Sequence, residues 1–265
     1  MTIEPEILEY YAQNREGERL TAGPPVLELL RTQLLLRRYL PAPPARVVEV
    51  GGATGVYASW LAGLGYDVDL IDPVPLHIEQ ASAVGGFRAE LGDARQLPKP
   101  ENTYDAVLLL GPLYHLTDRA DRVLAFTEAA RVVRPGGLVV GAAISRYAST
   151  LEGYYRSLLD LPDFTPIMRQ DLATGQHRNS TGAGPYFTTA FFHTPDELTG
   201  EVLDAGLTLE AVLPIEGPLN WAPGIRERLA DPVQRQLVFD ILAQIEQDPA
   251  MTAATSHLLA VARRP

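Results

Sequence analysis

The 265-residue chain contains no cysteine. This absence excludes disulfide frameworks, zinc sites built from thiolates and cysteine nucleophiles. The chain also has no block of Lys or Arg, and its 22 basic and 33 acidic side chains give a net charge of −11. Because this surplus of negative charge repels phosphate backbones and anionic lipid surfaces, we expect neither a nucleic-acid partner nor a membrane partner.

Signal-peptide features and long apolar runs are missing as well. The chain begins MTIEPEILEYY, which is acidic and lacks a basic n-region and an apolar h-region, and no later run approaches the length of a membrane span. We therefore expect a cytoplasmic protein. The hydrophobic fraction of 46% and the charged fraction of 21% are ordinary for a globular chain. A single domain over residues 1–265 is expected, and it should need no metal to fold.

The chain does contain a regular alternation of strand-like and helix-like segments. Apolar runs predict strands at 47–50, 67–72, 87–91, 104–110, 138–145, 208–214 and 256–264. A helical pattern at 118–133 offers four residues to the sheet: Val123, Leu124, Ala130 and Val133. The alternation predicts an α/β fold with a doubly wound, mostly parallel, seven-stranded Rossmann-like sheet.

Two segments interrupt this alternation. Residues 1–45 form a predicted N-terminal helical cap, whose amphipathic helix at 24–40 could pack on its own domain or across a homodimer. Residues 147–193, between the fifth and sixth strands, are polar, aromatic and punctuated by Pro and Gly, which predicts an inserted lid. A new helix then begins at HTPDE, where Thr194 is the expected N-cap and Glu197 completes a capping box.

The ends of the predicted strands carry the groups that could bind a ligand. Glu49 ends the first strand and is followed by a glycine-rich turn, Asp72 ends the second, Asp93 follows the third and Gly111 follows the fourth. In an open parallel sheet, ligands lie beyond the carboxyl ends of the strands at the topological switch point. An acid after the second strand can bind ribose hydroxyls and repels a 2′-phosphate. This pattern therefore favours an unphosphorylated adenosine.

Residues 46–144 resemble the class I S-adenosylmethionine-dependent methyltransferases, specifically their small-molecule group. The motifs EVGGATG, LIDPVP, GDARQLP and VVRPGG follow one another in the order typical of that family. Ala53 stands where the middle glycine of the first motif is usual, which a negative φ angle would tolerate. The resemblance implies a cofactor site formed by Glu49, Gly51, Gly52, Ala53, Gly55, Asp72, Pro73, Asp93, Ala94 and Gly111.

The same resemblance assigns parts of S-adenosylmethionine to these residues. Gly51 and Gly55 would line the methionine part, with Glu49 fixing its amino group. Asp72 would hold the ribose diol, Asp93 and Ala94 would contact the adenine, and Gly111 would lie under the transferable methyl group. The implied activity is methyl transfer to an oxygen, nitrogen or carbon of a small molecule.

The loop GPLYHLT, which follows the fourth strand, supplies the candidate catalytic residue. His115 is the best-placed candidate base, because an imidazole titrates near neutrality. A capping or lid-binding role for His115 stays open. Candidate substrate contacts come from the two flanking segments and from this loop: Tyr11, Arg19, Tyr114, Arg178 and Tyr186.

Two other function classes fit parts of this pattern. A non-catalytic S-adenosylmethionine-binding protein would keep every cofactor residue, and only turnover separates it from an enzyme. An NAD-dependent dehydrogenase would share the first strand–helix–strand unit and the ribose acid, but it needs a diphosphate loop and has no use for the RPGG and GDA motifs.

Overall fold

A computed structural model of the chain describes residues 4–12, 20, 26–179 and 186–265. Its sheet consists of β1 (Arg46–Val50), β2 (Asp67–Asp72), β3 (Arg88–Leu91), β4 (Tyr104–Leu109), β5 (Val133–Ser145), β6 (Gln176–His177), β7 (Ala190–His193), β8 (Thr208–Pro214) and β9 (His257–Arg263). The order is β3-β2-β1-β4-β5-β7-β6, and β9 pairs with both β5 and β8. The predicted doubly wound α/β fold is confirmed.

The sheet has nine strands among the described residues, so the predicted number of seven is wrong. The two additional strands are β6 and β7, which lie inside the segment predicted as a lid. Strands β1 to β5 and β7 run parallel to one another, whereas β9 pairs antiparallel with β5 and β8, and β6 pairs antiparallel with β7. Short strands such as β7, AFFH, cannot be told from apolar loop residues by periodicity alone, because four residues complete only two alternations.

Strand β7 has a particular place beside β5. Leu109, the last residue of β4, pairs with Gly141, whereas β7 pairs with Ile144 and Ser145. Strand β9 pairs with β5 from Leu138 to Ile144, so it occupies the opposite edge. Strands β4 and β7 therefore share one edge of β5, and the chain leaves the sheet after Leu109 at the break between them.

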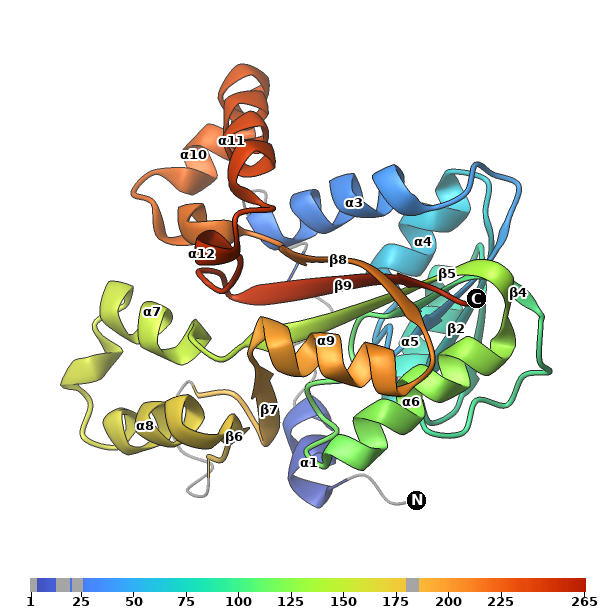
Figure 1. Ribbon diagram of the computed structural model, residues 1–265, viewed down its shortest axis with the longest axis horizontal. Coiled ribbons are helices and arrows are strands. Elements are labelled where there is room, and N and C mark those ends of the chain that lie inside the picture. Colours follow the sequence, from blue (N-terminus) through green and yellow to red (C-terminus); the bar gives the residue numbers. More distant parts are fainter. Residues whose placement is uncertain (1–3, 13–19, 21–25, 180–185) are drawn as a thin grey trace.

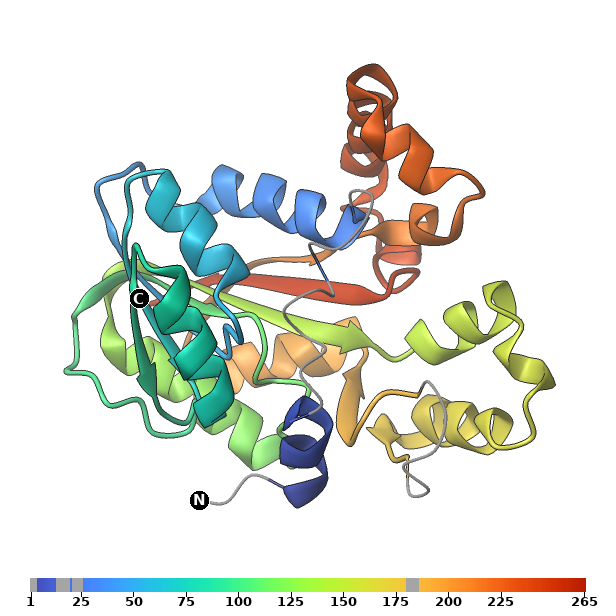
Figure 2. The same cartoon turned by 180° about the vertical axis from the view of Figure 1, so that it is seen from behind.

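The helices are α1 (Pro5–Ala12), α3 (Leu27–Tyr39), α4 (Val56–Gly63), α5 (Pro75–Val84), α6 (Arg119–Val132), α7 (Ala148–Tyr155), α8 (Phe164–Thr174), α9 (Pro195–Asp204), α10 (Ile225–Ala230), α11 (Pro232–Ile245) and α12 (Pro249–Thr252), with short 3₁₀ helices at Leu158–Asp160 and Gly217–Trp221. Helices α3, α4 and α5 cover one face of the sheet, and α6 and α9 cover the other (Figures 1 and 2). None of the helices in these ranges is long and apolar enough to cross a membrane.

Helix α6 presents a different face to the sheet from the one predicted. Ala125, Phe126, Ala129 and Val132 are fully buried, whereas Leu124 is 36% exposed. Of the predicted residues, Ala130 packs half-buried against the core, whereas the prediction missed the fully buried Ala125 and Ala129. Val133 is buried, but it already belongs to β5.

The predicted start of α9 is confirmed in detail. Thr194 accepts a hydrogen bond from the Glu197 backbone N–H, and Glu197 accepts one from the Thr194 backbone N–H, with Pro195 in the first turn. This reciprocal pair satisfies two N–H groups that have no partner within the helix.

Two helices of the N-terminal cap lie within the described residues, and their surroundings differ. Helix α3 buries Leu35 and Leu36 against the sheet, so its apolar face packs on its own domain. Helix α1 lies at the carboxyl ends of the parallel strands, next to the start of α6 (Figure 1). It is fixed there by Glu6, which accepts a hydrogen bond from the Thr189 hydroxyl at 2.5 Å.

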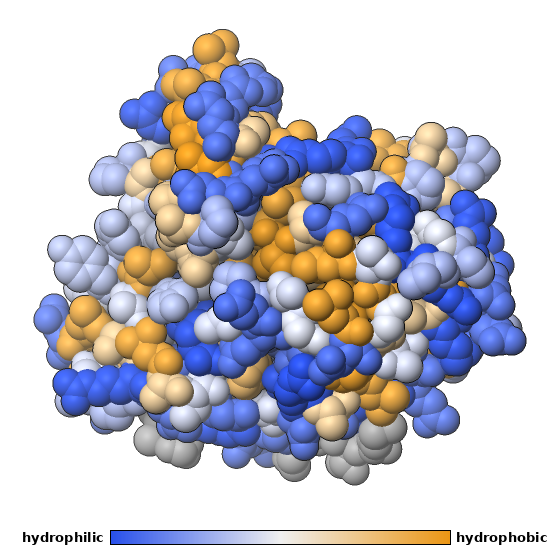
Figure 3. Space-filling view, in the orientation of Figure 1, coloured by the Kyte–Doolittle hydropathy of each residue, from blue (hydrophilic) through white to orange (hydrophobic). Residues whose placement is uncertain are grey.

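Helix α11 projects from the body of the molecule and carries an exposed apolar stripe. Val233, Leu237 and Ile241 are spaced four residues apart and are 75%, 50% and 39% exposed. Figure 3 shows apolar atoms on this projection, at the top of the view.

Candidate active site

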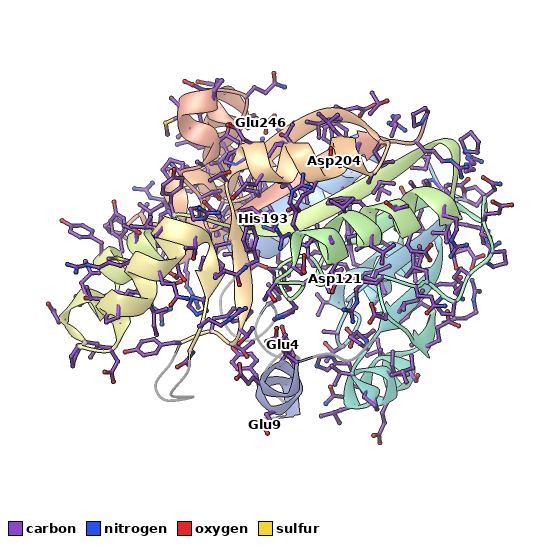
Figure 4. All side chains as sticks on the ribbon, turned by 60° about the horizontal axis from the view of Figure 1, so that its bottom comes forward. Glu4, Glu9, Asp121, His193, Asp204 and Glu246 are labelled. Atoms are coloured by element: carbon purple, nitrogen blue, oxygen red, sulfur yellow. The ribbon has the colours of Figure 1, made fainter. Side chains whose placement is uncertain are left out.

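The first of two adjoining cavities lies where the sheet changes direction. Strand β1 has β2 on one side and β4 on the other, and the loops after these strands enclose a cavity of about 310 Å³. The predicted carboxylates Glu49, Asp72 and Asp93 all line it. Glu4 and Asp121 line it too, and both are labelled near the centre of Figure 4, with Glu4 below Asp121. The three acids that the sequence singled out at the strand ends therefore lie around one cavity.

Glu49 is buried at the floor of this cavity, with 1% of its surface exposed. Burial raises its pKa to about 8, and the neighbouring Asp72 carboxylate adds to this, against the backbone N–H of Ala58, which opposes it. One carboxyl oxygen, Oε2, has no hydrogen-bond partner within the described residues. A buried acid with an unused oxygen fits an incoming ammonium group, because pairing removes the cost of ionising the acid.

Asp72 joins the end of β2 to the turn that follows β1. Its Oδ2 accepts a hydrogen bond from the Ala53 backbone N–H at 2.9 Å. Its Oδ1 accepts from the Val74 backbone N–H at 2.9 Å and from His77 Nδ1 at 3.0 Å. These contacts hold the carboxylate in one orientation at the cavity wall. A carboxylate fixed in this way can accept from a ribose diol through its remaining lone pairs.

Asp93 is held by Arg95, which the sequence analysis did not select. The Arg95 guanidinium donates to both oxygens of Asp93 and also to Asp121 Oδ2 at 2.6 Å. Burial of Asp93 raises its pKa, but the Arg95 hydrogen bonds outweigh this and hold the pKa below its ordinary value. The Asp93 carboxylate therefore stays ionised and can accept from an exocyclic amine, with Ala94 beside it on the wall.

Glycine is needed at two positions in this region, for a different structural reason at each. A Cβ on Gly111 would lie 2.1 Å from the carbonyl oxygen of Gly51, so the loops after β4 and β1 touch at the backbone. Gly55 does not line the cavity, contrary to the placement implied by the resemblance. It starts α4 with φ +84°, and a Cβ there would lie 2.4 Å from the ring of Phe87. Gly55 is thus a packing position.

Ala53 adopts a backbone conformation that the sequence analysis did not expect. Its φ is +47°, in the left-handed region, whereas a negative φ was the condition for tolerating alanine. This conformation costs an L-residue about 1 kcal/mol relative to glycine. The hydrogen bond from the Ala53 N–H to Asp72 holds the turn in this shape. With Gly51, Gly52 and Pro73, Ala53 lines the cavity as predicted.

The second cavity, of about 470 Å³, adjoins the first. Four residues line both: Tyr11, Tyr57, Leu110 and Tyr114. Its other walls come from α3, α7, α8, β5, β7 and the β8–β9 end of the sheet, with Phe164, Tyr186 and Phe187 among the aromatic residues. The two cavities therefore meet at a junction of three tyrosines and one leucine, next to the point where the chain leaves β4.

His115 is half-buried beside this junction and lines the first cavity. Tyr11 Oη lies 2.6 Å from His115 Nε2, and His115 Nδ1 lies 3.3 Å from the Thr189 carbonyl oxygen. Because a carbonyl only accepts, Nδ1 carries the proton, and Nε2 accepts from the Tyr11 hydroxyl. Burial lowers the pKa of His115 to about 4, so its imidazole is neutral at pH 7.

The remaining substrate candidates are placed unequally. Tyr114 lines both cavities, and Tyr186 lines the second, with its ring 5.4 Å from that of Phe164. Arg178 lines neither cavity; its guanidinium donates to the His177 carbonyl at 3.2 Å. Arg19 lies outside the described residues.

Several residues that line the cavities were not selected from the sequence. His77 is buried, holds Asp72, and packs edge-on against the Tyr11 ring at 5.2 Å. Tyr57 lies on α4 at the junction of the cavities. Arg95 could have been found, because an acid and an Arg two residues apart in a loop after a strand often pair. His77 and Tyr57 gave no signal, since a lone His or Tyr on a helix is usually a core residue.

Comparisons with known proteins agree with this architecture. A family model described as "Methyltransferase domain" matches residues 48–141. An uncharacterized methyltransferase of Mycobacterium tuberculosis (strain ATCC 25618 / H37Rv) is 38% identical over 99 residues, 37% of this chain and 39% of that protein. A ubiquinone biosynthesis O-methyltransferase of Methylobacterium nodulans is 28% identical over 65% of this chain and 64% of its own length. The chain thus spans about two fifths of the first curated relatives it matches.

Solved structures extend the likeness over most of the fold. An S-adenosylmethionine-dependent methyltransferase of Mesorhizobium loti superposes with a TM-score of 0.59 over 90% of this chain and 100% of its own, at 17% identity. The matched region of the family model ends in β5, and it includes the strand-end acids and the glycine-rich turn. The motif order, the sheet topology and these likenesses together support the resemblance of this chain to the class I S-adenosylmethionine-dependent methyltransferases, and residues 48–141 match the methyltransferase-domain model.

Proposed function

We propose that this protein transfers the methyl group of S-adenosylmethionine to an oxygen, nitrogen or carbon atom of a small molecule bound in the second cavity. The observation that carries this proposal is the junction of the two cavities at Tyr11, Tyr57, Leu110 and Tyr114. One cavity fits an adenosine with an amino-acid tail, and the other is large enough for a small organic acceptor.

The first cavity fits the cofactor at three points. The unused oxygen of Glu49 suits the cofactor ammonium, the fixed carboxylate of Asp72 suits the ribose diol, and Asp93 beside Ala94 suits the adenine amine. When bound, S-adenosylmethionine supplies an electrophilic methyl group on a sulfonium. Gly111 lines this cavity without a side chain that would fill it.

We propose that the residues of the chain contribute to methyl transfer mainly by aligning the two reacting atoms and by excluding water from them. In-line methyl transfer gains most from holding the two reacting atoms in place, and a base is needed only when the acceptor must lose a proton. Tyr11, Tyr57 and Tyr114 surround the point of transfer with aromatic rings. We propose that α1, which carries Tyr11, and the α7–α8 segment cover the site together.

We propose that His115 acts on the acceptor indirectly, through the Tyr11 hydroxyl. Tyr11 lines both cavities, whereas His115 lines only the first, so a bound acceptor meets the tyrosine hydroxyl before the imidazole. An acceptor proton can pass to the Tyr11 oxygen while the Tyr11 proton passes to His115 Nε2, 2.6 Å away. The low pKa of His115 means that it would hold such a proton only briefly.

Calorimetry with S-adenosylhomocysteine tests the donor half of this proposal. The parent protein should bind it, and Asp72→Ala should weaken binding at least tenfold, since a charge-assisted hydrogen-bond pair contributes about 1.5–3 kcal/mol. Asp196→Ala, in the first turn of α9 and outside both cavities, is the matched control. No binding by the parent, or equal binding by Asp72→Ala, would refute the proposal.

Turnover separates the enzyme from a protein that only binds the cofactor. A screen of small molecules with S-adenosylmethionine, read by mass spectrometry for products heavier by one methylene, should yield at least one methylated acceptor. The second cavity favours the catalytic alternative, because a protein that only bound the cofactor would have no use for an enclosed space beside the methyl group.

A further inference from the structure

The loop after β4, residues 111–117, brings His115 to the junction of the two cavities and is called here the junction loop. One side chain holds the two backbone carbonyls that follow His115. Arg122 Nη1 donates to the carbonyl oxygen of Leu116 at 2.8 Å and to that of Thr117 at 3.0 Å. A single guanidinium thus fixes the end of the junction loop directly after the imidazole.

Arg122 is itself fixed inside the protein. It lies in the first turn of α6, and only 2% of its surface is exposed. Its Nε and Nη2 lie 2.9 and 2.7 Å from Glu201 Oε1 on α9, and its Cζ lies 3.7 Å from the centre of the Phe191 ring on β7. A guanidinium can make these contacts together, because its N–H groups point in fixed directions and its face stacks on an aromatic ring.

Glu201 is the anion that holds the guanidinium. It is fully buried, and its second oxygen accepts a hydrogen bond at 3.1 Å from Nε2 of His193, which is labelled near the centre of Figure 4. Burial of Glu201 raises its pKa, but the hydrogen bonds from His193 and Arg122 outweigh this and hold the pKa below its ordinary value. Burial also lowers the pKa of His193, whose Nδ1 has no hydrogen-bond partner in the part of the chain that the structure describes. The group therefore contains one cation, one anion and a neutral imidazole, so its charges balance.

Strand β7 holds the junction loop as well. The Phe191 backbone N–H donates to the Tyr114 carbonyl at 2.7 Å, and the Thr189 carbonyl oxygen lies 3.3 Å from His115 Nδ1. Phe191 is therefore both the ring that packs on the Arg122 guanidinium and a backbone partner of the loop. A displaced guanidinium would loosen the contacts that place the imidazole.

The beginning of the junction loop is held without Arg122. Gly111 packs so closely on the Gly51 carbonyl oxygen that a Cβ there would lie 2.1 Å from it. The hydrogen bonds that fix Asp72 and Asp93 in the first cavity also come from other residues. Loss of the guanidinium should therefore displace the end of the loop and spare the strand-end acids.

Stability alone is a poor explanation for the Arg122–Glu201 pair. Taking two charged groups out of water is costly, and apolar side chains of similar volume often give a protein of equal or higher stability. Directed hydrogen bonds from a buried guanidinium to two successive carbonyls do what apolar packing cannot, because they define one position of the backbone.

We infer that Arg122, held by Glu201, is a positioning residue: it sets His115 at the junction through the two backbone carbonyls that follow. This inference rests on the proposed function, in which His115 takes up a proton through Tyr11. Displacement of a catalytic group by about 1 Å can lower the rate about 100-fold, so the contacts that fix this loop should matter for turnover.

Nitrogen-15 NMR of the five histidine side chains tests the inference without an acceptor. The signals of His115 are those lost in His115→Ala, and in the parent they should show a proton on Nδ1 and a hydrogen-bonded Nε2. In Arg122→Lys, which keeps the charge but not the planar fork, these signals should shift toward a mixture of both tautomers. Unchanged His115 signals in the folded variant would overturn the inference.

Arg146→Lys is the matched control. Arg146 is also buried, pairs with Glu197 of α9 at 2.7 Å and lies near the Phe191 ring. Its Nε donates to the Phe192 carbonyl rather than to the junction loop. This variant should leave the His115 signals where they are in the parent. Equal shifts in the two arginine variants would show general loosening and contradict the positioning role.

Gln176→Ala keeps the test valid if Arg122→Lys fails to fold. Gln176 is half-buried at the start of β6, and its Nε2 donates to the Thr117 carbonyl at 3.0 Å. Removing this hydrogen bond frees the same end of the loop in part, so the His115 signals should shift in the same direction by a smaller amount. The absence of any shift in Gln176→Ala would then count against the inference.

Turnover of an acceptor found by the mass-spectrometric screen gives a second readout. Arg122→Lys should lower kcat about 10- to 100-fold, with the affinity for S-adenosylhomocysteine changed less than about threefold. In a His115→Ala background the same substitution should lower kcat less than about threefold, because no imidazole is left to place. An undiminished further loss in that background would contradict the inference.

The two proposals fail in different ways. A parent protein that does not bind S-adenosylhomocysteine refutes the proposed function. A parent protein that binds it, with His115 signals that Arg122→Lys leaves unchanged, refutes the positioning role alone.

Discussion

The two cavities are built in different ways, although they share four residues. The walls of the first come mainly from loops that follow β1, β2, β3 and β4, and its polar groups are fixed by short hydrogen bonds such as Asp93 to Arg95. The walls of the second come from helices and strand ends spread from Tyr10 to His257. The first cavity is formed by the loops at the carboxyl ends of the parallel strands. The second is formed largely by helices and strand ends that lie around the sheet.

This difference suggests how the loops of the first cavity can stay fixed while the residues that line the second cavity change. Loops at the carboxyl ends of parallel strands are held at both ends by the sheet, so their backbone atoms are placed accurately. Segments such as α1 and α7–α8 are held by fewer contacts, and their side chains can change without disturbing the sheet.

Gly111→Ala should have the largest effect, and it acts on the first cavity. The new Cβ would lie 2.1 Å from the Gly51 carbonyl oxygen, so the loops after β1 and β4 must separate. We expect a loss of about 2–3 kcal/mol in the free energy of unfolding by urea denaturation, and loss of S-adenosylhomocysteine binding. Gly63→Ala, at the end of α4 with open space around it, should be neutral or slightly stabilising. Similar losses in both variants would show that the contact is not tight.

Changes at the Tyr11–His115 pair should affect turnover and spare cofactor binding. Tyr11→Phe removes the hydroxyl that donates to His115 Nε2, and His115→Ala removes the acceptor. Each should lower kcat about 100-fold with an acceptor found by the mass-spectrometric screen, with S-adenosylhomocysteine affinity changed less than threefold. Unchanged kcat in both would remove the pair from proton transfer and leave alignment as the source of rate.

The pH dependence of cofactor binding should report on Glu49. Burial raises the pKa of Glu49 to about 8 in the free protein, so the acid is protonated at neutral pH. Pairing with an ammonium requires the ionised form, so binding releases a proton, and affinity rises with pH until about 8 and then levels off. The slope is at most tenfold per pH unit. Calorimetry of S-adenosylhomocysteine binding in buffers of different ionisation enthalpy counts this proton.

Glu49→Gln provides the control for that measurement. The amide cannot ionise, so the proton release and the pH slope attributed to Glu49 should both disappear, while the overall affinity falls. A slope that persists in this variant would assign the proton to another group.

Ala53→Gly should have the smallest effect and the opposite sign. Glycine relieves the left-handed φ of +47°, but it also makes the unfolded chain more flexible. We expect a net gain of about 0.5–1 kcal/mol in the free energy of unfolding by urea. Ala130→Gly, in the regular helix α6, should lose about 1 kcal/mol in the same assay. A loss in both variants would mean that the turn around Ala53 relaxes without glycine.

Sequence reasoning predicted several local features and the lining of the first cavity closely. The strand at 67–72, the capping box at Thr194 and Glu197, and the meeting of Glu49, Asp72 and Asp93 in one cavity are all found in the structure. These features depend on residues near one another in the chain, or on the rule that parallel strands end at one edge. Where the sequence analysis was wrong, at the buried face of α6 and at β6 and β7, close packing and pairing decided the outcome.

The sequence by itself determined which loops meet at the first cavity, because motif order along a strand–helix ladder fixes spatial order at the edge of a parallel sheet. Only the tertiary structure decided the second cavity. It placed Tyr11 on His115 and brought Glu28 and Glu216 to His257 across long stretches of chain. No local pattern encodes such meetings, because they depend on how separate helices and strand ends pack over the same opening.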